Sequence, residues 1–177
     1  MIKNIKINLD LLESMLYYWK ATSEREKVGE QFLYTIADNA NMKACYSDEF
    51  DGESVRRALS AISNREIFRP ESKKEGRFWN NNMWMLEDPE YTMTMLTPLK
   101  VLNLDAEVKA IATDKEIETV NLVILPGHMD ISYLDKASNT LAINFFRVLP
   151  SLVDETVTID DVELKEYIIG KIEELVQ

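Results

Sequence analysis

Two apolar segments in the second half of the chain have the pattern of β-strands. Residues 119–125 and 141–148 are rich in β-branched and aromatic side chains. Leu122 and Ile124 fall on one face of the first segment, and other apolar residues occupy its opposite face. Apolar side chains on both faces need cover on both sides, so this strand is expected in the middle of a sheet. With residues 129–134 between them, the two segments predict a three-stranded antiparallel meander.

The first half of the chain has helical periodicity. A helix over residues 9–20 shows one narrow polar stripe and is expected to be mostly buried. Ser23 and Glu26 have the spacing of a capping box, which predicts a second helix that ends near residue 40. A third helix is expected from Glu53 onward, with Asp51 as its cap.

The remaining segments are less regular. Residues 65–86 fit either a hairpin or a helix, and residues 99–113 fit either a strand or a short helix capped by Asp105. A closing helix is expected over residues 162–176, with Asp160 as its cap. Short strands are expected at 5–9, at 91–96 (which Pro98 would end) and at 157–159.

Together these elements predict an α+β protein. The chain is helix-rich over residues 1–90, strand-rich over 91–160 and closed by the helix over 162–176, so the helical first half is expected to pack on an antiparallel sheet built mainly by the second half. A length of 177 residues suffices for one core, and no linker-like segment separates the halves. We therefore expect residues 1–177 to form a single domain.

Composition indicates the class of protein and its cellular compartment. The hydrophobic content of 46% is ordinary for a globular protein, and no apolar run is long enough to span a bilayer, so no membrane partner is expected. The N-terminal residues lack the apolar stretch of a secretory signal, and Cys45 is the only cysteine, which excludes an intrachain disulfide. These features predict a cytoplasmic protein.

The formal charge of −11 is unevenly distributed. Between residues 56 and 77 there are seven basic residues against three acidic ones, whereas residues 154–177 hold eight acidic residues and two lysines. Two solvated faces are the ordinary interpretation; alternatively, the two regions bind different partners or each other. The candidate binding residues are the basic ones and two nearby tryptophans: Arg56, Arg57, Arg65, Arg69, Lys73, Lys74, Arg77, Trp79 and Trp84.

One functional hypothesis is a winged-helix-like nucleic-acid-binding regulator built from residues 53–86. The third helix would present outward arginines to bases, and a hairpin with Lys73 and Lys74 at its tip would contact phosphates. The net negative charge of the chain disfavours nucleic acid as a partner.

A second hypothesis is a thiol-dependent enzyme. Cys45 and His128 are each unique in the chain, and Asp130 would orient the imidazole. However, a lone cysteine is usually a buried apolar residue, and a histidine beside the Pro126-Gly127 turn is expected to be exposed. No other catalytic residue is expected.

No metal site and no cofactor are expected, because the chain has neither a set of histidine or cysteine ligands nor a glycine-rich phosphate loop. The preferred hypothesis is a non-enzymatic protein-binding or regulatory protein that self-associates. Its three tryptophans and eight methionines are residue types that are enriched at interfaces.

Overall fold

The computed structural model describes all 177 residues and contains a four-stranded mixed sheet. In space the strands follow the order β1 (Ile2–Asn8), β2 (Ile117–Leu125), β4 (Thr140–Asn144) and β3 (Ser132–Asp135). Strand β2 runs parallel to both of its neighbours, with Ile5 opposite Val120 and Val123 opposite Ala142. Only β3 and β4 form an antiparallel pair in this sheet.

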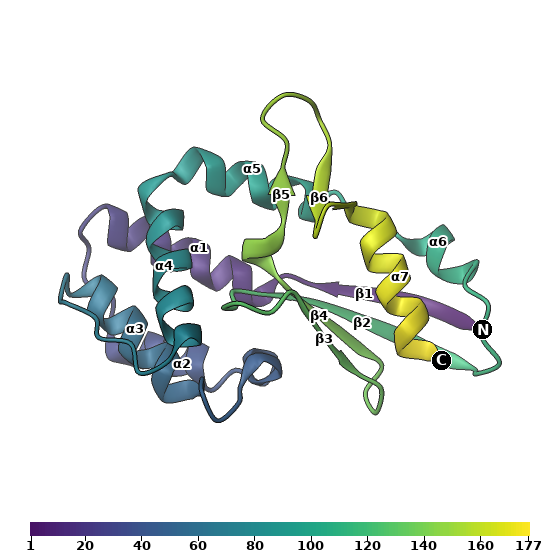
Figure 1. The fold of residues 1–177 in the computed structure, drawn as a ribbon, viewed down its shortest axis with the longest axis horizontal. Coiled ribbons are helices and arrows are strands. Elements are labelled where there is room, and N and C mark those ends of the chain that lie inside the picture. The colour runs from purple at the N-terminus through teal and green to yellow at the C-terminus, as the bar shows by residue number, and fades with distance from the viewer.

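Most helices lie between β1 and β2 in the chain and gather at one end of the molecule (Figure 1). Helices α1 and α4 pack against each other, as do α2 and α3, α3 and α4, and α4 and α5. The bounds of the helical elements are α1 (Asp10–Ser23), α2 (Glu30–Ala37), the short 3-10 helix η1 (Met42–Cys45), α3 (Gly52–Ser63), α4 (Lys73–Glu87), α5 (Pro89–Lys100) and α6 (Asp105–Lys109).

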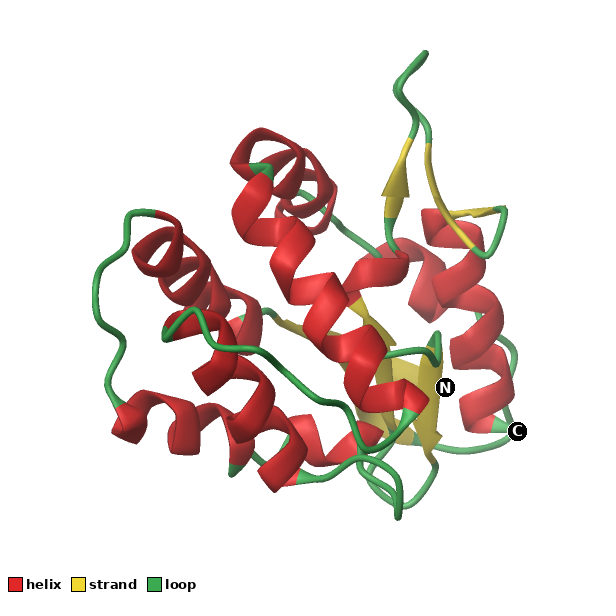
Figure 2. Ribbon diagram, turned by 60° about the vertical axis from the view of Figure 1, so that its left-hand side comes forward, coloured by secondary structure: helices red, strands yellow, loops and turns green.

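The C-terminal part adds a small second sheet and a closing helix. After the 3-10 helix η2 (Phe145–Arg147), strands β5 (Leu149–Pro150), β6 (Val157–Ile159) and β7 (Val162–Glu163) pair antiparallel in that order. Helix α7 (Leu164–Val176) then packs against β3 and β4. Residues 149–157 form a hairpin that projects away from the rest of the molecule, and we call it the β5–β6 arm (Figures 1 and 2).

The core is one continuous cluster of 44 buried apolar residues. Leu122 and Ile124 are buried on one face of β2 and Val123 and Leu125 on the other, so β2 is covered on both sides as its sequence pattern predicted. The α+β class is confirmed, with helices in the first half and α7 at the end. No helix has the length and apolar character needed to cross a membrane.

The predicted antiparallel meander is wrong. The connection after β2, residues 126–131, carries the chain past one strand position to the edge of the sheet, where β3 forms. The turn after β3 brings β4 back into the vacant position beside β2, which makes β2 and β4 parallel. Strand β1, expected as a short edge strand at 5–9, does lie at an edge and is longer.

The strand predicted at residues 91–96 is helix α5. Asp88 caps this helix by accepting a hydrogen bond from the Tyr91 N–H at 3.0 Å, and Pro89 occupies its first turn. These start signals outweigh the alternation of methionine and threonine. Pro98 lies within the helix and does not end it.

Of the helix caps predicted for the second, third and closing helices, only that of the third is confirmed. Ser23 ends α1, and Arg25 has a positive φ of 62° that turns the chain, so no capping box forms there and α2 begins at Glu30. Asp160 lies in a turn with positive φ, and Glu163 caps α7 instead. Asp51 caps α3 as expected.

The segment 99–113 contains the short helix α6. Its N-cap position is Leu104, and Asp105 is its first helical residue, so the helical alternative is confirmed and the capping residue is wrong. The expected strand at 157–159 is β6, and the closing helix is confirmed as α7.

Candidate functional site: an apolar groove beside Trp84

An apolar groove of about 420 Å³ lies between helices α4 and α5, the η2 turn and the base of the β5–β6 arm. Its apolar lining comes from all four of these segments. Its lining includes Trp84, Met85, Tyr91, Phe146, Leu149 and Leu152. Ligand and partner sites are typically concave and apolar in this way.

The rim of this groove exposes large apolar side chains. Two of the residues that line it, Trp84 and Leu152, are 60% and 87% exposed, and Val153, which follows Leu152 on the arm, is 92% exposed. Scattered exposed apolar residues are normal on protein surfaces, but several around one groove mark an interaction site. The arm projects from the rest of the molecule (Figure 2), and Leu152 and Val153 on it are largely uncovered by other parts of the chain.

Trp84 belongs to a stripe along α4. The hydroxyl of Ser72 accepts a hydrogen bond from the Glu75 N–H at 3.1 Å and starts this helix. Lys73, Arg77 and Trp84 are exposed and follow one another at i, i+4 and i+11, which places them on one face. A basic end and an apolar end therefore share the outer face of α4.

Arg56 and Arg57, two of the candidate binding residues, are held by carboxylates of the same chain. Arg56 donates to Glu53 at 3.0 Å from Nε, and its guanidinium lies 5.8 Å from the centre of the Tyr34 ring. Arg57 donates to Glu75 at 2.9 Å. Both arginines are thus neutralised within the fold.

Glu75 explains why Arg57 is fixed. Its side chain is only 5% exposed and accepts hydrogen bonds from the Ser54 hydroxyl at 2.6 Å and the Glu71 N–H at 2.9 Å. Burial opposes the ionisation of Glu75, but these two bonds and Arg57 outweigh it and hold the pKa of Glu75 below its ordinary 4.5. This buried ion pair joins α3 to α4.

The remaining basic residues divide into two groups. Arg65 donates to the backbone oxygen of Thr22 at 3.3 Å, and Lys74 lies 4.0 Å from a carboxylate oxygen of Asp130. In contrast, no salt bridge forms at the three exposed side chains of Arg69, Lys73 and Arg77.

Trp79 is a packing residue. Its ring stacks on Phe68 with centroids 6.4 Å apart, and its indole nitrogen is buried without a hydrogen-bond partner. Of the two candidate tryptophans, only Trp84 lines the groove.

The winged-helix layout does not form. Lys73 and Lys74 open helix α4, so residues 73–87 make a helix where the hypothesis needs a hairpin. The outward arginines of α3 are also occupied by Glu53 and Glu75.

No protein-family model, curated protein or solved structure matches this chain. The function must therefore be inferred from its own surfaces and side chains.

The fold brings Cys45 and His128 together, but not as a catalytic pair. His128 is buried, so its expected exposure beside the turn is wrong. Its Nδ1 accepts the Met129 N–H at 2.7 Å, which leaves Nε2 to donate to the backbone oxygen of Cys45 at 2.9 Å. The imidazole thus contacts the Cys45 carbonyl, and the thiol bonds separately to the backbone oxygen of Met42 at 3.1 Å.

The surroundings of Cys45 also disfavour a thiolate. Burial raises the pKa of the Cys45 thiol to about 12, so the nucleophilic form is scarce at neutral pH. Asp130 accepts a hydrogen bond from Tyr133 at 3.0 Å and makes none to His128. No group of three or more histidine, cysteine, aspartate or glutamate side chains is placed to hold a metal ion.

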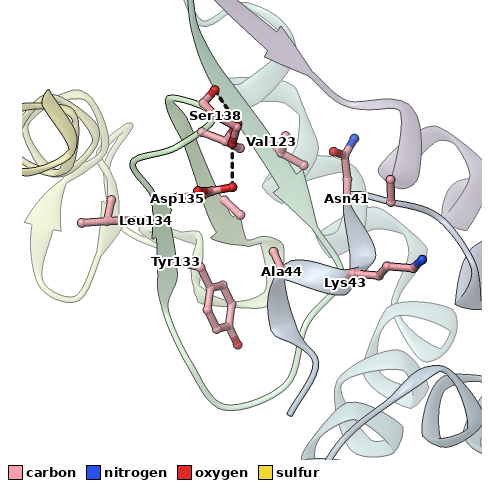
Figure 3. Close-up of a pocket in the computed structure, with 11 residues that line it drawn as sticks. Asn41, Lys43, Ala44, Val123, Tyr133, Leu134, Asp135 and Ser138 are labelled. Atoms are coloured by element: carbon pink, nitrogen blue, oxygen red, sulfur yellow. Dashed lines mark hydrogen bonds between the residues drawn. The ribbon is translucent and has the colours of Figure 1, made fainter.

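A second cavity of about 540 Å³ lies between η1 and the β3–β4 hairpin (Figure 3). Val123, Ala142 and Tyr133 line it from the sheet, and Lys43 lies on the opposite side. Its only carboxylate, Asp135, accepts hydrogen bonds from Ser138 and from the Ala137 N–H and so stabilises the hairpin turn (Figure 3). The charged groups of this cavity therefore do not converge on a ligand.

Sequence reasoning missed the arm side of the groove. Leu152 and Val153 follow Pro150 in a polar loop, and two adjacent apolar residues among Ser151, Asp154 and Glu155 were the available signal. The alternation of residues 91–96 predicts a strand at Tyr91, so the sequence does not indicate that Tyr91 lines a groove.

Proposed function

We propose that this is a cytoplasmic, non-enzymatic protein-binding protein that self-associates through the groove beside Trp84. The observation that carries the proposal is the exposure of Trp84 and Leu152, which line one apolar groove, together with that of Val153, which follows Leu152 on the arm. Tryptophan is among the residues that contribute most to binding when a partner buries them. An exposed apolar rim around a groove is the geometry of such an interface.

A protein partner fits this face better than a nucleic acid does. The net charge of −11 repels a polyanion, and only Lys73 and Arg77 bring free positive charge to the stripe that contains Trp84. The arm of a second copy carries an apolar pair followed by two acidic residues. It can therefore place apolar side chains in the groove and negative charge beside the basic end of the stripe.

Light scattering across a range of protein concentrations tests this proposal. The parent should show a mass that rises above that of the monomer with concentration, and Trp84→Ser should stay monomeric. Ile67→Ser is the matched control, because Ile67 is 86% exposed but lies outside the groove. A parent that remains monomeric at every concentration contradicts the proposal, as does a Trp84→Ser variant that associates like the parent.

A further inference from the structure

We infer that the part of the second copy that occupies the groove is its β5–β6 arm, which lies along the exposed stripe of α4. This inference rests on the proposed self-association and specifies how the two copies meet. The arm and the stripe are complementary in the order of their side chains. Leu152 and Val153 on the arm precede Asp154 and Glu155, and the stripe passes from Trp84 to the basic Arg77 and Lys73.

Apolar and charged residues lie near one another on both surfaces. Seven helical residues separate Arg77 from Trp84, which is about 10 Å at 1.5 Å per residue. Leu152 and Glu155 lie on the tip of the arm, a series of bends that the Ser151 N–H closes by donating to the Thr156 carbonyl at 2.8 Å. When Leu152 of an arm contacts Trp84, Glu155 lies on the same tip, and the long side chains of Glu155 and Arg77 extend across the remaining distance.

The charges that would meet are free in the single chain. Arg77 and Glu155 are exposed, and neither takes part in a salt bridge or a side-chain hydrogen bond within the chain. Asp154 instead stabilises its own turn by accepting the Thr156 N–H at 2.9 Å. Glu155 is thus the acidic residue of the arm tip that is available to a partner.

The contact can be reciprocal. The groove is bounded by the same arm, since Leu149 at its base and Leu152 in its loop both line it. An arm from a second copy that enters the groove therefore passes close to the arm of the first copy. A two-fold axis between the two arms makes both contacts identical and leaves no open end for further growth, as in closed dimers. Each charge pair then occurs twice.

Charge reversal with mixing tests the inference. Arg77→Glu and Glu155→Lys each change both symmetric contacts from attraction to repulsion, so each should weaken self-association about tenfold. Mixing the two variants should restore it. In the mixed dimer one contact is native, and the other joins the two substituted positions, whose charges are again opposite because both have been reversed.

Lys27→Glu and Asp114→Lys serve as controls, because both side chains are exposed and unpaired away from the groove. Sedimentation velocity measures the dissociation constants, and circular dichroism checks that each variant is folded. Restoration on mixing supports the arm contact. If the parent self-associates and both single variants associate as tightly as the parent, the arm contact is wrong, whereas the proposed function is not contradicted. A parent that never associates overturns both.

Discussion

His128 and Cys45, each the only residue of its type in the chain, meet through a hydrogen bond of 2.9 Å between the imidazole Nε2 and the Cys45 backbone oxygen. The bond joins the segment after β2 to the 3-10 helix η1 across 83 positions of sequence. The Phe50 ring packs edge-on against the imidazole with centroids 4.7 Å apart. The pair therefore stabilises the junction between the helical end and the sheet.

This environment predicts a pH dependence of stability. Burial lowers the pKa of His128 below its ordinary value of 6.5, so the unfolded chain binds a proton at a higher pH than the folded chain does. Between the two pKa values the unfolded state holds more protons, and the free energy of unfolding falls as the pH drops below 6.5. Because the chain has one histidine, His128 dominates the pH dependence of stability at pH values where the carboxylates are still ionised.

Urea unfolding at about pH 7.5 and about pH 5.5 measures this effect. The free energy of unfolding of the parent should fall at the lower pH. That of His128→Gln should be smaller than the parent's at the higher pH and should fall less between the two. Equal losses in the two proteins would show that His128 is not the titrating group.

Arg57→Ala should destabilise the fold by about 2–3 kcal/mol, because it leaves the buried carboxylate of Glu75 without its cation. Arg69→Ala is the control, since its exposed guanidinium makes no salt bridge and its loss should change stability by less than about 0.5 kcal/mol. Chemical denaturation compares the two. A similar small effect in both variants would mean that Arg57 is a surface residue like Arg69.

Deleting residues 162–177 should abolish cooperative folding. Helix α7 buries Ile168 and Ile172 completely and packs against β3 and β4, so its loss exposes the apolar side chains beneath it. Thermal unfolding followed by circular dichroism measures the result. A truncated chain that melts like the parent would contradict the expectation of one domain over residues 1–177.

Local patterns predicted much of the fold. The cap at Asp51 and the apolar stripe of α7 could be predicted because a helix depends on residues that are a few positions apart. The burial of Leu122 was readable because β2 is apolar on both faces. The direction of β4 could not be predicted in this way. It depends on where the connection after β2 places β3 in the sheet, and tertiary packing determines that position.

Less of the candidate functional site could be predicted from the sequence. Glu75 lies 18 positions from Arg57, so the pairing that removes this arginine from a binding surface has no local signature. Glu53 and Arg56 are three residues apart on a helix, so this ion pair does have a local signature, although Arg56 was expected on a binding surface. Trp84 was among the candidate residues, but its neighbours on the arm were hidden because no local pattern places residues 149–157 beside α4 and α5.

The most direct test of self-association follows the indole N–H signals of the three tryptophans by NMR as the protein is diluted. Trp19 donates its indole N–H to Asn82 at 3.0 Å and Trp79 is packed on Phe68, so both signals should keep their positions. The Trp84 signal, identified by its loss in Trp84→Phe, should shift with concentration because a second copy covers this ring. A Trp84 signal that stays fixed from concentrated to dilute protein would contradict self-association through the groove.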